Sequence, residues 1–326
     1  MVNMRQYGLI GRKLGHSFSA RFFSGKFADE SISATYSLME LPSIACLRDL
    51  LAEKGELCGF NVTIPYKQEV IPHLASATDA ARKIGAVNTV RVFRPKNPIL
   101  PAGGAMNALY GENTDAPGFR AAIEPLLPHA TRRALVLGSG GASRAVAYAL
   151  AEMGIPVTPV SRRPSGNAIA YSDISEETIA AHNLIVNCTP LGMWPDTSSA
   201  PDIPYSYIGA GHLCFDLVYN PETTLFMRKC RERGATVSNG LQMLINQALL
   251  AWDFWQQPIT RRFMSRIIEV ESPTGEISSY PLSVAEATYG PDNRIIRLDI
   301  RPYECEIPGV EYFDAPLRFR YPDASL

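Results

Sequence analysis

ALVLGSGGASRA, residues 134–145, predicts an apolar strand, a glycine turn and the first turn of a helix. Gly138 permits a tight turn, and Gly140 and Gly141 let backbone amides approach a pyrophosphate group closely. The N-terminus of the helix adds N–H donors and a partial positive charge. The strict pattern has glycine at its sixth position, where this sequence has Ser143. We interpret the stretch as a dinucleotide-binding turn, with a purely structural turn as the alternative.

The next predicted strand ends in VSRRP, residues 160–164, about 20 residues beyond the glycine turn. An NAD site usually carries an acidic residue at that place, where it binds the ribose hydroxyls. Here the place holds Ser161, Arg162 and Arg163. Guanidinium groups bind a 2′-phosphate, which a carboxylate would repel. The pattern favours NADP over NAD, and the alternative is that both arginines are solvated surface residues.

Short apolar runs alternate with helical patterns along the chain, which is typical of α/β architecture with a mostly parallel sheet. The first series is predicted at Tyr7–Gly11, Ser17–Ala28, Ala34–Leu41, Ser43–Lys54 and Cys58–Thr63. The second series is predicted at Ala134–Leu137, Ala142–Met153, Val157–Val160, Leu184–Asn187 and Leu213–Leu217. Between them, Arg94–Gly104 is rich in proline and glycine and predicts a loop or hairpin connection. We place a domain boundary near Pro117–Arg120.

The C-terminal part of the chain differs in texture from the rest. An amphipathic helix is predicted from Gly240 to about Gln256, because apolar residues recur there at helical spacing. Its period does not reveal which domain it packs against. After Val270 prolines and acidic residues are frequent, and apolar and charged residues alternate at 296–301 and 317–321. The alternation predicts two half-buried strands, with a disordered acidic tail as the alternative.

The composition indicates a folded protein without a strong charge bias. The 326 residues are 46% hydrophobic and 19% charged, with a formal net charge of −1. A large basic excess is missing, so no nucleic-acid partner is expected. No apolar run approaches the roughly 20 residues that span a bilayer, and the N-terminus lacks signal-peptide features, so we expect a cytoplasmic protein without a membrane partner. The six cysteines include no CxxC pair, so we expect free thiols and no metal site.

Small polar residues end or flank several elements of the first series. They include Ser17 and Ser19 at a helix start, Asn61 and Thr63 on one strand, Asn88, and Asp115. In open α/β sheets, ligands bind at the carboxyl ends of the strands. Two hydroxyls at a helix start could also bind a carboxylate or a diol. Taken singly, Ser17 could be a helix cap, Asp115 could cap a helix that begins near Pro117, and Lys67 could be a solvated charge.

Taken together and in this order, eight segments resemble the shikimate dehydrogenase family, over roughly residues 5–270. They are GHSFS (15–19), FNVTIPYK (60–67), IGAVNT (84–89), NTDAPGF (113–119), GSGGASRA (138–145), NCTPLGM (187–193), DLVYNP (216–221) and NGLQMLINQ (239–247). Each motif alone is weak, but the set in family order is highly specific. Gln242 stands where small residues are common, which could perturb packing near Met243. The segment after Val270 has no counterpart in the family pattern.

The resemblance implies a substrate domain of residues 1–117 and 241–270, a Rossmann-like NADP-binding domain of residues 118–240, and a cleft between them. Residues 271–326 form a C-terminal extension whose role is open. The implied substrate contacts are Ser17 and Ser19 for a carboxylate, Asn61, Thr63, Asn88 and Gln247 for hydroxyls and ring, and Tyr219 on the carboxylate side. The implied cofactor contacts are Gly138, Ser139, Gly140, Gly141, Ala142, Ser161, Arg162, Arg163, Thr189, Met193, Gly240 and Met243.

The resemblance also implies an activity, the reversible NADPH-dependent reduction of 3-dehydroshikimate to shikimate in chorismate and aromatic amino-acid biosynthesis. Lys67 and Asp115 would form the catalytic pair, since a positioned lysine can protonate or stabilise the developing oxyanion. Whether Lys67 donates the proton or only polarises the oxygen stays open. Two alternatives are a quinate/shikimate dehydrogenase that could use NAD, and a non-catalytic dinucleotide-binding regulator. We expect a small-molecule substrate and a monomer or homodimer.

Overall fold

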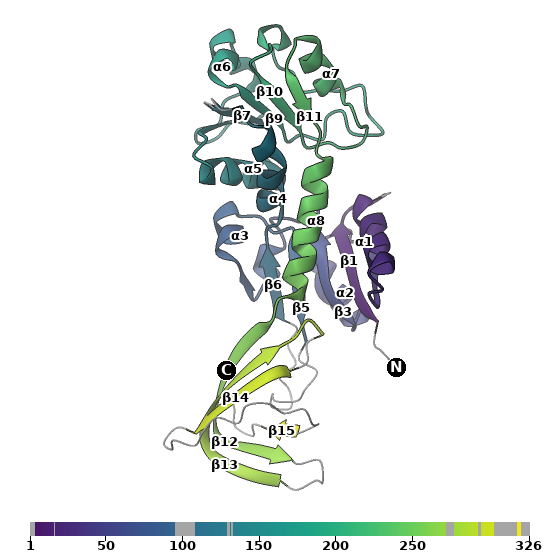
Figure 1. Cartoon of the computed structure of the whole chain (residues 1–326), viewed down its shortest axis with the longest axis vertical. Helices are drawn as coiled ribbons and strands as arrows, with labels where there is room; N and C mark the ends of the chain where they lie inside the picture. Colours follow the sequence, from purple (N-terminus) through teal and green to yellow (C-terminus); the bar gives the residue numbers. More distant parts are fainter. Residues whose placement is uncertain are drawn as a thin grey trace.

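The computed structural model of the chain describes residues 4–15, 17–94, 108–128, 131, 133–271, 277–292, 295–302 and 318–320. These residues form three sheets that follow one another along the molecule (Figure 1). Within the described ranges, no helix has the length and apolar character needed to cross a membrane. The cysteines in this part of the chain are not joined in disulfides, and Cys305 lies outside it.

The first sheet has six strands in the order β2-β1-β3-β5-β6-β4. Its strands are β1 (Arg5–Gly11), β2 (Ala34–Glu40), β3 (Leu57–Val62), β4 (Ser76–Ala77), β5 (Thr89–Phe93) and β6 (Ala108–Glu112), and its helices are α1 (Phe18–Asp29), α2 (Leu47–Glu53) and α3 (Asp79–Ile84). β1 pairs in parallel with β2 and β3, whereas β5 runs antiparallel to β3 and β6. The α/β class is confirmed, with a first sheet that is mixed. The antiparallel β5–β6 pair agrees with a hairpin connection, whose residues 95–107 lie outside the described ranges.

The second sheet is parallel throughout, with the strand order β11-β10-β9-β7-β8. Its strands are β7 (Ala134–Leu137), β8 (Val157–Val160), β9 (Leu184–Asn187), β10 (Leu213–Asp216) and β11 (Thr236–Ser238), and its helices are α5 (Gly141–Glu152), α6 (Glu176–Ala181) and α7 (Leu225–Glu232). Because β7 lies between β8 and β9, the strand order reverses at β7. This switch point places the glycine turn at the carboxyl edge of the sheet, where ligands bind in open α/β sheets.

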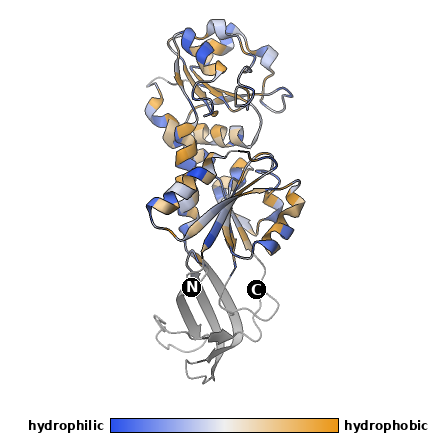
Figure 2. Cartoon of the chain, turned by 90° about the vertical axis from the view of Figure 1, so that its right-hand side faces the viewer, coloured by the Kyte–Doolittle hydropathy of each residue, from blue (hydrophilic) through white to orange (hydrophobic). Residues whose placement is uncertain are grey.

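Two helices, α4 (Asp115–Ile123) and α8 (Leu241–Gln256), pack against each other between the first two sheets. One apolar core continues across this junction, from Ala86 beside the first sheet through Phe119 of α4 and Met243 of α8 to Phe215 of β10. Figure 2 shows the helical segments between the two sheets largely in the orange of apolar residues. The two sheets are therefore joined by a shared core as well as by the chain.

The C-terminal half of α8 packs on the first sheet. Trp252 and Trp255 of this helix lie in one buried cluster with Tyr7 of β1 and Phe23 of α1. The Trp255 ring stacks on Tyr7 with centroids 4.7 Å apart, and its Nε1 donates to the Val90 carbonyl at 3.0 Å. The helical period of the sequence did not reveal the packing partner of α8. In the structure, one end of α8 packs in the junction between the two sheets and the other end packs on the first sheet.

The third sheet is antiparallel, with the order β14-β13-β12-β15. Its strands are β12 (Ile259–Glu271), β13 (Ile277–Tyr289), β14 (Ile295–Pro302) and β15 (Arg318–Arg320). β14 and β15 confirm the two strands predicted from alternation, so an unstructured tail is wrong for these residues. The long β12–β13 hairpin was not predicted. β12 also begins at Ile259, ahead of residue 271, where the sequence led us to expect the start of an extension.

The third sheet is attached to β5 of the first. The buried Tyr289, at the end of β13, meets Phe93 edge to face, with ring centroids 4.8 Å apart. Arg91 of β5 is also buried, and its Nη2 donates to the Gly290 carbonyl at 2.9 Å. These contacts hold the base of the hairpin against the first sheet.

Candidate active site

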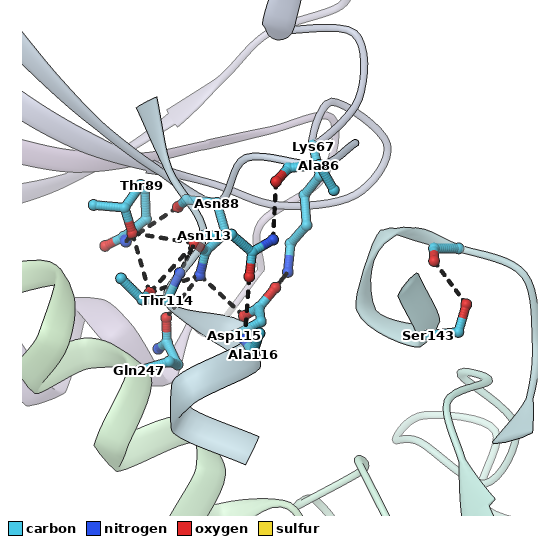
Figure 3. Close-up of polar contacts among 12 residues, drawn as sticks. Lys67, Ala86, Asn88, Thr89, Asn113, Thr114, Asp115, Ala116, Ser143 and Gln247 are labelled. Carbon is cyan, nitrogen blue, oxygen red and sulfur yellow. Dashed lines mark hydrogen bonds and ion pairs between the residues drawn. The ribbon is translucent and has the colours of Figure 1, made fainter. Parts of the chain in front are cut away.

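Lys67 and Asp115 form an ion pair at the carboxyl edge of the first sheet. Lys67 lies on the turn after β3, and Asp115 is the first residue of α4. Lys67 Nζ lies 2.5 Å from Asp115 Oδ2, and the two side chains are 16% and 7% exposed. Figure 3 shows the ammonium group of Lys67 pointing at the carboxylate of Asp115. Ser143 of α5 lies on the other side of Lys67 from Asp115 in this view. The structure therefore brings together the two residues that the sequence singled out, in a place where little water reaches them.

Asn88 links this pair to a network of buried polar side chains. Its Nδ2 donates to Asp115 Oδ1 and to Thr114 Oγ1, both at 2.9 Å, and to Gln247 Oε1 at 3.3 Å. Its Oδ1 accepts a 2.7 Å hydrogen bond from the Thr114 N–H. Because each of these groups has a buried partner, the carboxylate is held in one orientation toward Lys67.

Asp115 does not cap helix α4. Its two oxygens bond to the side chains of Lys67 and Asn88. The backbone N–H of Ala116 instead donates to Asn113 Oδ1 at 3.1 Å. The helix-cap explanation of Asp115 is therefore wrong. Asn113 is the residue whose side chain accepts a hydrogen bond from a backbone N–H in the first turn of α4.

Asn61 and Thr63 lie at the end of β3 and just beyond it. Asn61 is buried, and its amide bonds within the first sheet: Oδ1 accepts from the Tyr36 hydroxyl at 2.8 Å, and Nδ2 donates to Thr89 Oγ1 at 3.1 Å. Asn61 Nδ2 also donates to the Asn88 carbonyl at 3.2 Å. Thr63 is partly exposed. Asn61 is thus part of the network around Asn88, and Thr63 lies outside it.

A cavity of about 840 Å³ lies between α1 and the loop that follows β10. Ser17 and Tyr219 line it from the two sides, together with the apolar side chains of Phe18, Leu38 and Leu241. Lys67, Asp115 and Ser19 are not among its lining residues. Ser17 and Tyr219 thus face the same cavity from two different elements.

Ser17 is the N-cap of α1, because its Oγ accepts a 3.2 Å hydrogen bond from the Ser19 N–H. The simple cap explanation of Ser17 is confirmed. Ser19 is buried, and burial raises the pKa of the nearby Tyr36, against an opposing effect of Ser19. A capping hydroxyl still has its own O–H donor, so the cap does not prevent Ser17 from contacting a ligand.

The glycine turn joins β7 to α5 as predicted. Gly138 has φ +116°, a conformation that favours glycine, and a Cβ on Gly140 would meet nothing within 4 Å. Ser143 is buried and donates to the Gly140 carbonyl at 2.7 Å, so the departure from the strict glycine pattern is accommodated by a hydrogen bond. Ser139 is exposed and Ala142 is partly exposed on this turn. Backed by the N-terminus of a 12-residue helix, the turn can hold a pyrophosphate.

Ser161, Arg162 and Arg163 follow β8. Ser161 Oγ accepts from the Arg163 N–H at 3.2 Å, which holds a tight turn at the end of the strand. Both arginines are exposed, and neither forms an ion pair with another described residue. Such guanidinium groups can bind a phosphate. The same exposure also fits solvated surface arginines. Mutation of the arginines would distinguish the two explanations.

Thr189 and Met193 lie on the loop after β9. Asn187 Oδ1 accepts from the Thr189 N–H at 3.0 Å and from its hydroxyl at 2.6 Å. This pair of bonds fixes the start of the loop. Met193 is 43% exposed, which leaves its side chain available to a ligand.

Gly240 and Met243 lie at the start of α8. A Cβ on Gly240 would collide with the Leu217 carbonyl, so packing alone requires glycine there. Met243 is buried in the core shared by the two sheets. Gln242 is exposed and donates to Asn246 Oδ1 at 2.9 Å, so it does not disturb the packing of Met243.

Thr114 and Asp216 are two buried site groups that sequence reasoning missed. Asp216 Oδ1 accepts from Asn187 Nδ2 and from the Val218 N–H, both at 3.0 Å, and its Oδ2 accepts from the Thr224 hydroxyl at 2.6 Å. Burial raises the pKa of Asp216 to about 6, against the opposing effect of these hydrogen bonds. Both residues belong to segments that carry the family resemblance, and this position in a motif was the available signal.

The comparisons with known proteins agree on one family. The family model for the shikimate dehydrogenase substrate binding domain matches residues 9–90. The shikimate dehydrogenase (NADP(+)) of Symbiobacterium thermophilum is 35% identical over 277 residues, which cover 77% of this chain and 88% of the relative. The crystal structure of shikimate 5-dehydrogenase from Thermus thermophilus in complex with NADP(H) and shikimate matches with a TM-score of 0.65 and 32% identity, over 77% of this chain and 93% of that one.

A further structural neighbour is named for a different activity. Quinate dehydrogenase from Corynebacterium glutamicum in complex with NAD matches with a TM-score of 0.64 and 28% identity, over 76% of this chain and 92% of that one. The likeness to the Symbiobacterium relative spans most of that protein at 35% identity, and it confirms the resemblance seen in the eight segments. The chain therefore belongs to the shikimate dehydrogenase family.

Proposed function

We propose that the chain catalyses the reversible NADPH-dependent reduction of 3-dehydroshikimate to shikimate, a step of chorismate and aromatic amino-acid biosynthesis. The observation that carries the proposal is the mostly buried contact of Lys67 Nζ with Asp115 Oδ2 at 2.5 Å. A buried ion pair is weak evidence for stability, because desolvation of the charges offsets their attraction. A catalytic role explains why this family member keeps such a pair beside the glycine turn.

The chemistry follows from the geometry of the pair. NADPH would supply the hydride. Negative charge then develops on the ketone oxygen, and Lys67 Nζ donates a proton or a hydrogen bond to it. Asp115 holds the ammonium group through Oδ2, while Asn88 holds Asp115 through Oδ1. In the reverse direction, Lys67 in its neutral amine form would take up the proton that leaves the substrate hydroxyl, or its ammonium form would donate a hydrogen bond to that oxygen.

We propose that the substrate carboxylate binds near Ser17, Ser19 and Tyr219. Ser17 and Tyr219 line the same cavity, which supports a shared ligand. Ser19 is buried two residues beyond Ser17, and its hydroxyl would be the second contact of the carboxylate. The ring hydroxyls would bind to Asn61, Thr63, Asn88 and Gln247. For the amide oxygen of Asn61, which already accepts one hydrogen bond, the second lone pair is the available site.

We propose residues 118–240 as the NADP-binding domain and residues 1–117 with 241–270 as the substrate domain. Gly138 to Ala142 would bind the pyrophosphate, and Arg162 and Arg163 the 2′-phosphate. The positive φ of Gly138 and the open space at Gly140 fit a close approach of the phosphates. Thr189, Met193, Gly240 and Met243 would shape the nicotinamide side. The enzyme would act in the cytoplasm on its small-molecule substrate, as a monomer or homodimer.

The test is a turnover assay of the full-length protein with shikimate or quinate and with NADP or NAD. Formation of the reduced nicotinamide is followed by its absorbance. The proposal predicts the highest kcat/KM for shikimate with NADP. A preference for quinate with NAD would instead assign the chain the activity named for the Corynebacterium neighbour. Binding of NADPH without turnover of any pair would indicate a dinucleotide-binding regulator.

A further inference from the structure

The stem of Lys67 lies against the first turn of α5. A Cβ built on Gly141 would lie 3.2 Å from Lys67 Cβ and 3.4 Å from Lys67 Cδ. The next nearest atom is the Cβ of Ala86, at 3.5 Å. Real Cβ atoms rarely approach a neighbour as closely as 3.2 Å, so a side chain at this position would displace the lysine stem by a few tenths of an ångström. The missing side chain of Gly141 thus leaves room for Lys67.

Lys67 is held at its two ends by other groups. Its carbonyl accepts a 2.7 Å hydrogen bond from the Val87 N–H, and its Nζ meets Asp115 Oδ2 at 2.5 Å. The aliphatic stem between these ends has several rotatable bonds, and contact with a rigid surface restricts their rotamers. Helix α5 supplies such a surface at Gly141. Its position therefore sets the path by which the ammonium group reaches the carboxylate.

The two glycines at the start of α5 have different surroundings. Gly140 has φ −83° and nothing within 4 Å of an added Cβ, so an alanine fits there in an extended conformation. Gly141 is the first residue of the helix, and its φ is not among the positive values that require glycine. Its backbone would accept alanine, and the contacts with Lys67 and Ala86 are what disfavour it.

We propose that Gly141 is a positioning residue for Lys67, and that it couples the nucleotide-binding turn to the acid–base pair. This inference rests on the proposed function for the meaning of the pair. If Gly141 were needed only for the approach of a pyrophosphate, its replacement would affect nucleotide binding and would leave Lys67 unchanged in the nucleotide-free protein. A positioning glycine affects Lys67 whether or not the nucleotide is bound. The two roles therefore give different results.

The test compares Gly141→Ala with the matched variant Gly140→Ala in the full-length protein. The first readout is the rate at which an amine-acylating reagent modifies Lys67 without nucleotide, followed by mass spectrometry of the peptide that contains it. We expect Gly141→Ala to change this rate at least about 3-fold and to lower kcat at saturating NADPH at least about 10-fold. Gly140→Ala, at a position where an added Cβ does not meet Lys67, should leave the labelling rate of Lys67 unchanged and raise the KM for NADPH.

Equal effects of the two variants on kcat, or an unchanged labelling rate of Lys67 in Gly141→Ala, would overturn the proposal. If Gly141→Ala does not fold, the double variant Gly141→Ala with Lys67→Gly removes both contacted lysine atoms. Recovery of folding in the double variant supports the contact as the cause, and failure to recover overturns it. Because labelling needs no turnover, an inactive protein with the expected labelling difference would refute the proposed function alone.

Discussion

Replacing Asn88 by alanine would change the orientation of Asp115 while keeping its carboxylate. The variant keeps Lys67 and Asp115 but loses every side-chain bond of Asn88, among them the 2.9 Å bond to Asp115 Oδ1 and the 2.7 Å bond from the Thr114 N–H. Each loss leaves a buried polar group without its partner, which costs about 1–3 kcal/mol. We therefore expect Asn88→Ala to lower the free energy of unfolding by roughly 2–5 kcal/mol, allowing for relaxation around the site.

The same change should reduce catalysis, because the carboxylate keeps only one of its two side-chain partners. A carboxylate that rotates away from Lys67 misplaces the proton donor, and misplacement of about 1 Å can cost roughly 100-fold in rate. We expect kcat to fall by about 10–100-fold in Asn88→Ala, with the KM for NADPH changed far less. Steady-state kinetics and urea unfolding, at a temperature where the variant is fully folded, measure the two effects.

Asn113→Ala is the matched control. Asn113 is as buried as Asn88, and its side chain makes two hydrogen bonds, to the Ala86 carbonyl at 2.9 Å and from the Ala116 N–H at 3.1 Å. Its loss should destabilise the protein by a similar roughly 2–5 kcal/mol, while kcat stays within about 5-fold of the parent. If both variants lost the same fraction of kcat, orientation of Asp115 by Asn88 would be refuted.

Two further predictions concern the nucleotide and the buried carboxyl group. Arg162→Ala should raise the KM for NADPH at least about 10-fold and that for NADH little; equal changes would show that the arginine does not bind the 2′-phosphate. Burial raises the pKa of Asp216 from 3.8 to about 6, so its contribution to stability is greatest below about pH 4 and is lost as the pH rises through about 6. Wild type should therefore gain about 2–3 kcal/mol over Asp216→Asn between pH 7 and pH 4; urea unfolding of both proteins measures this, and a constant difference contradicts it.

Much of the second sheet was predictable because its strands are short apolar runs that end at polar residues or glycine. The predicted bounds Ala134–Leu137, Val157–Val160 and Leu184–Asn187 are the observed ones. The direction of β5 was not predictable, since a run of apolar residues is the same for a parallel and an antiparallel strand. The β12–β13 hairpin was missed because Arg261 and Arg262 are consecutive, which interrupts the alternation that marks a half-buried strand.

The residues of the site could be predicted from the sequence, but the contacts between them could not. The motifs named Lys67, Asp115, Asn88 and Gln247, and the structure gathers these four. Their partners depend on tertiary packing, since Asn88 and Gln247 bond across 159 positions of the chain. The alternative explanation of Asp115 as a helix cap was also decided by contacts that depend on tertiary packing. Only the fold could show that Asp115 bonds to side chains while Asn113 takes the backbone N–H of the helix.

We propose that Lys67 donates a proton or a hydrogen bond to the ketone oxygen of the substrate. The decisive experiment is to measure kcat of Lys67→Ala for shikimate with NADP, alongside Lys83→Ala, which removes an exposed lysine of α3. We predict a loss of at least about 100-fold for Lys67→Ala, with NADPH binding retained, and a normal kcat for Lys83→Ala. A Lys67→Ala enzyme with near-normal kcat would show that Lys67 has no part in the proton chemistry.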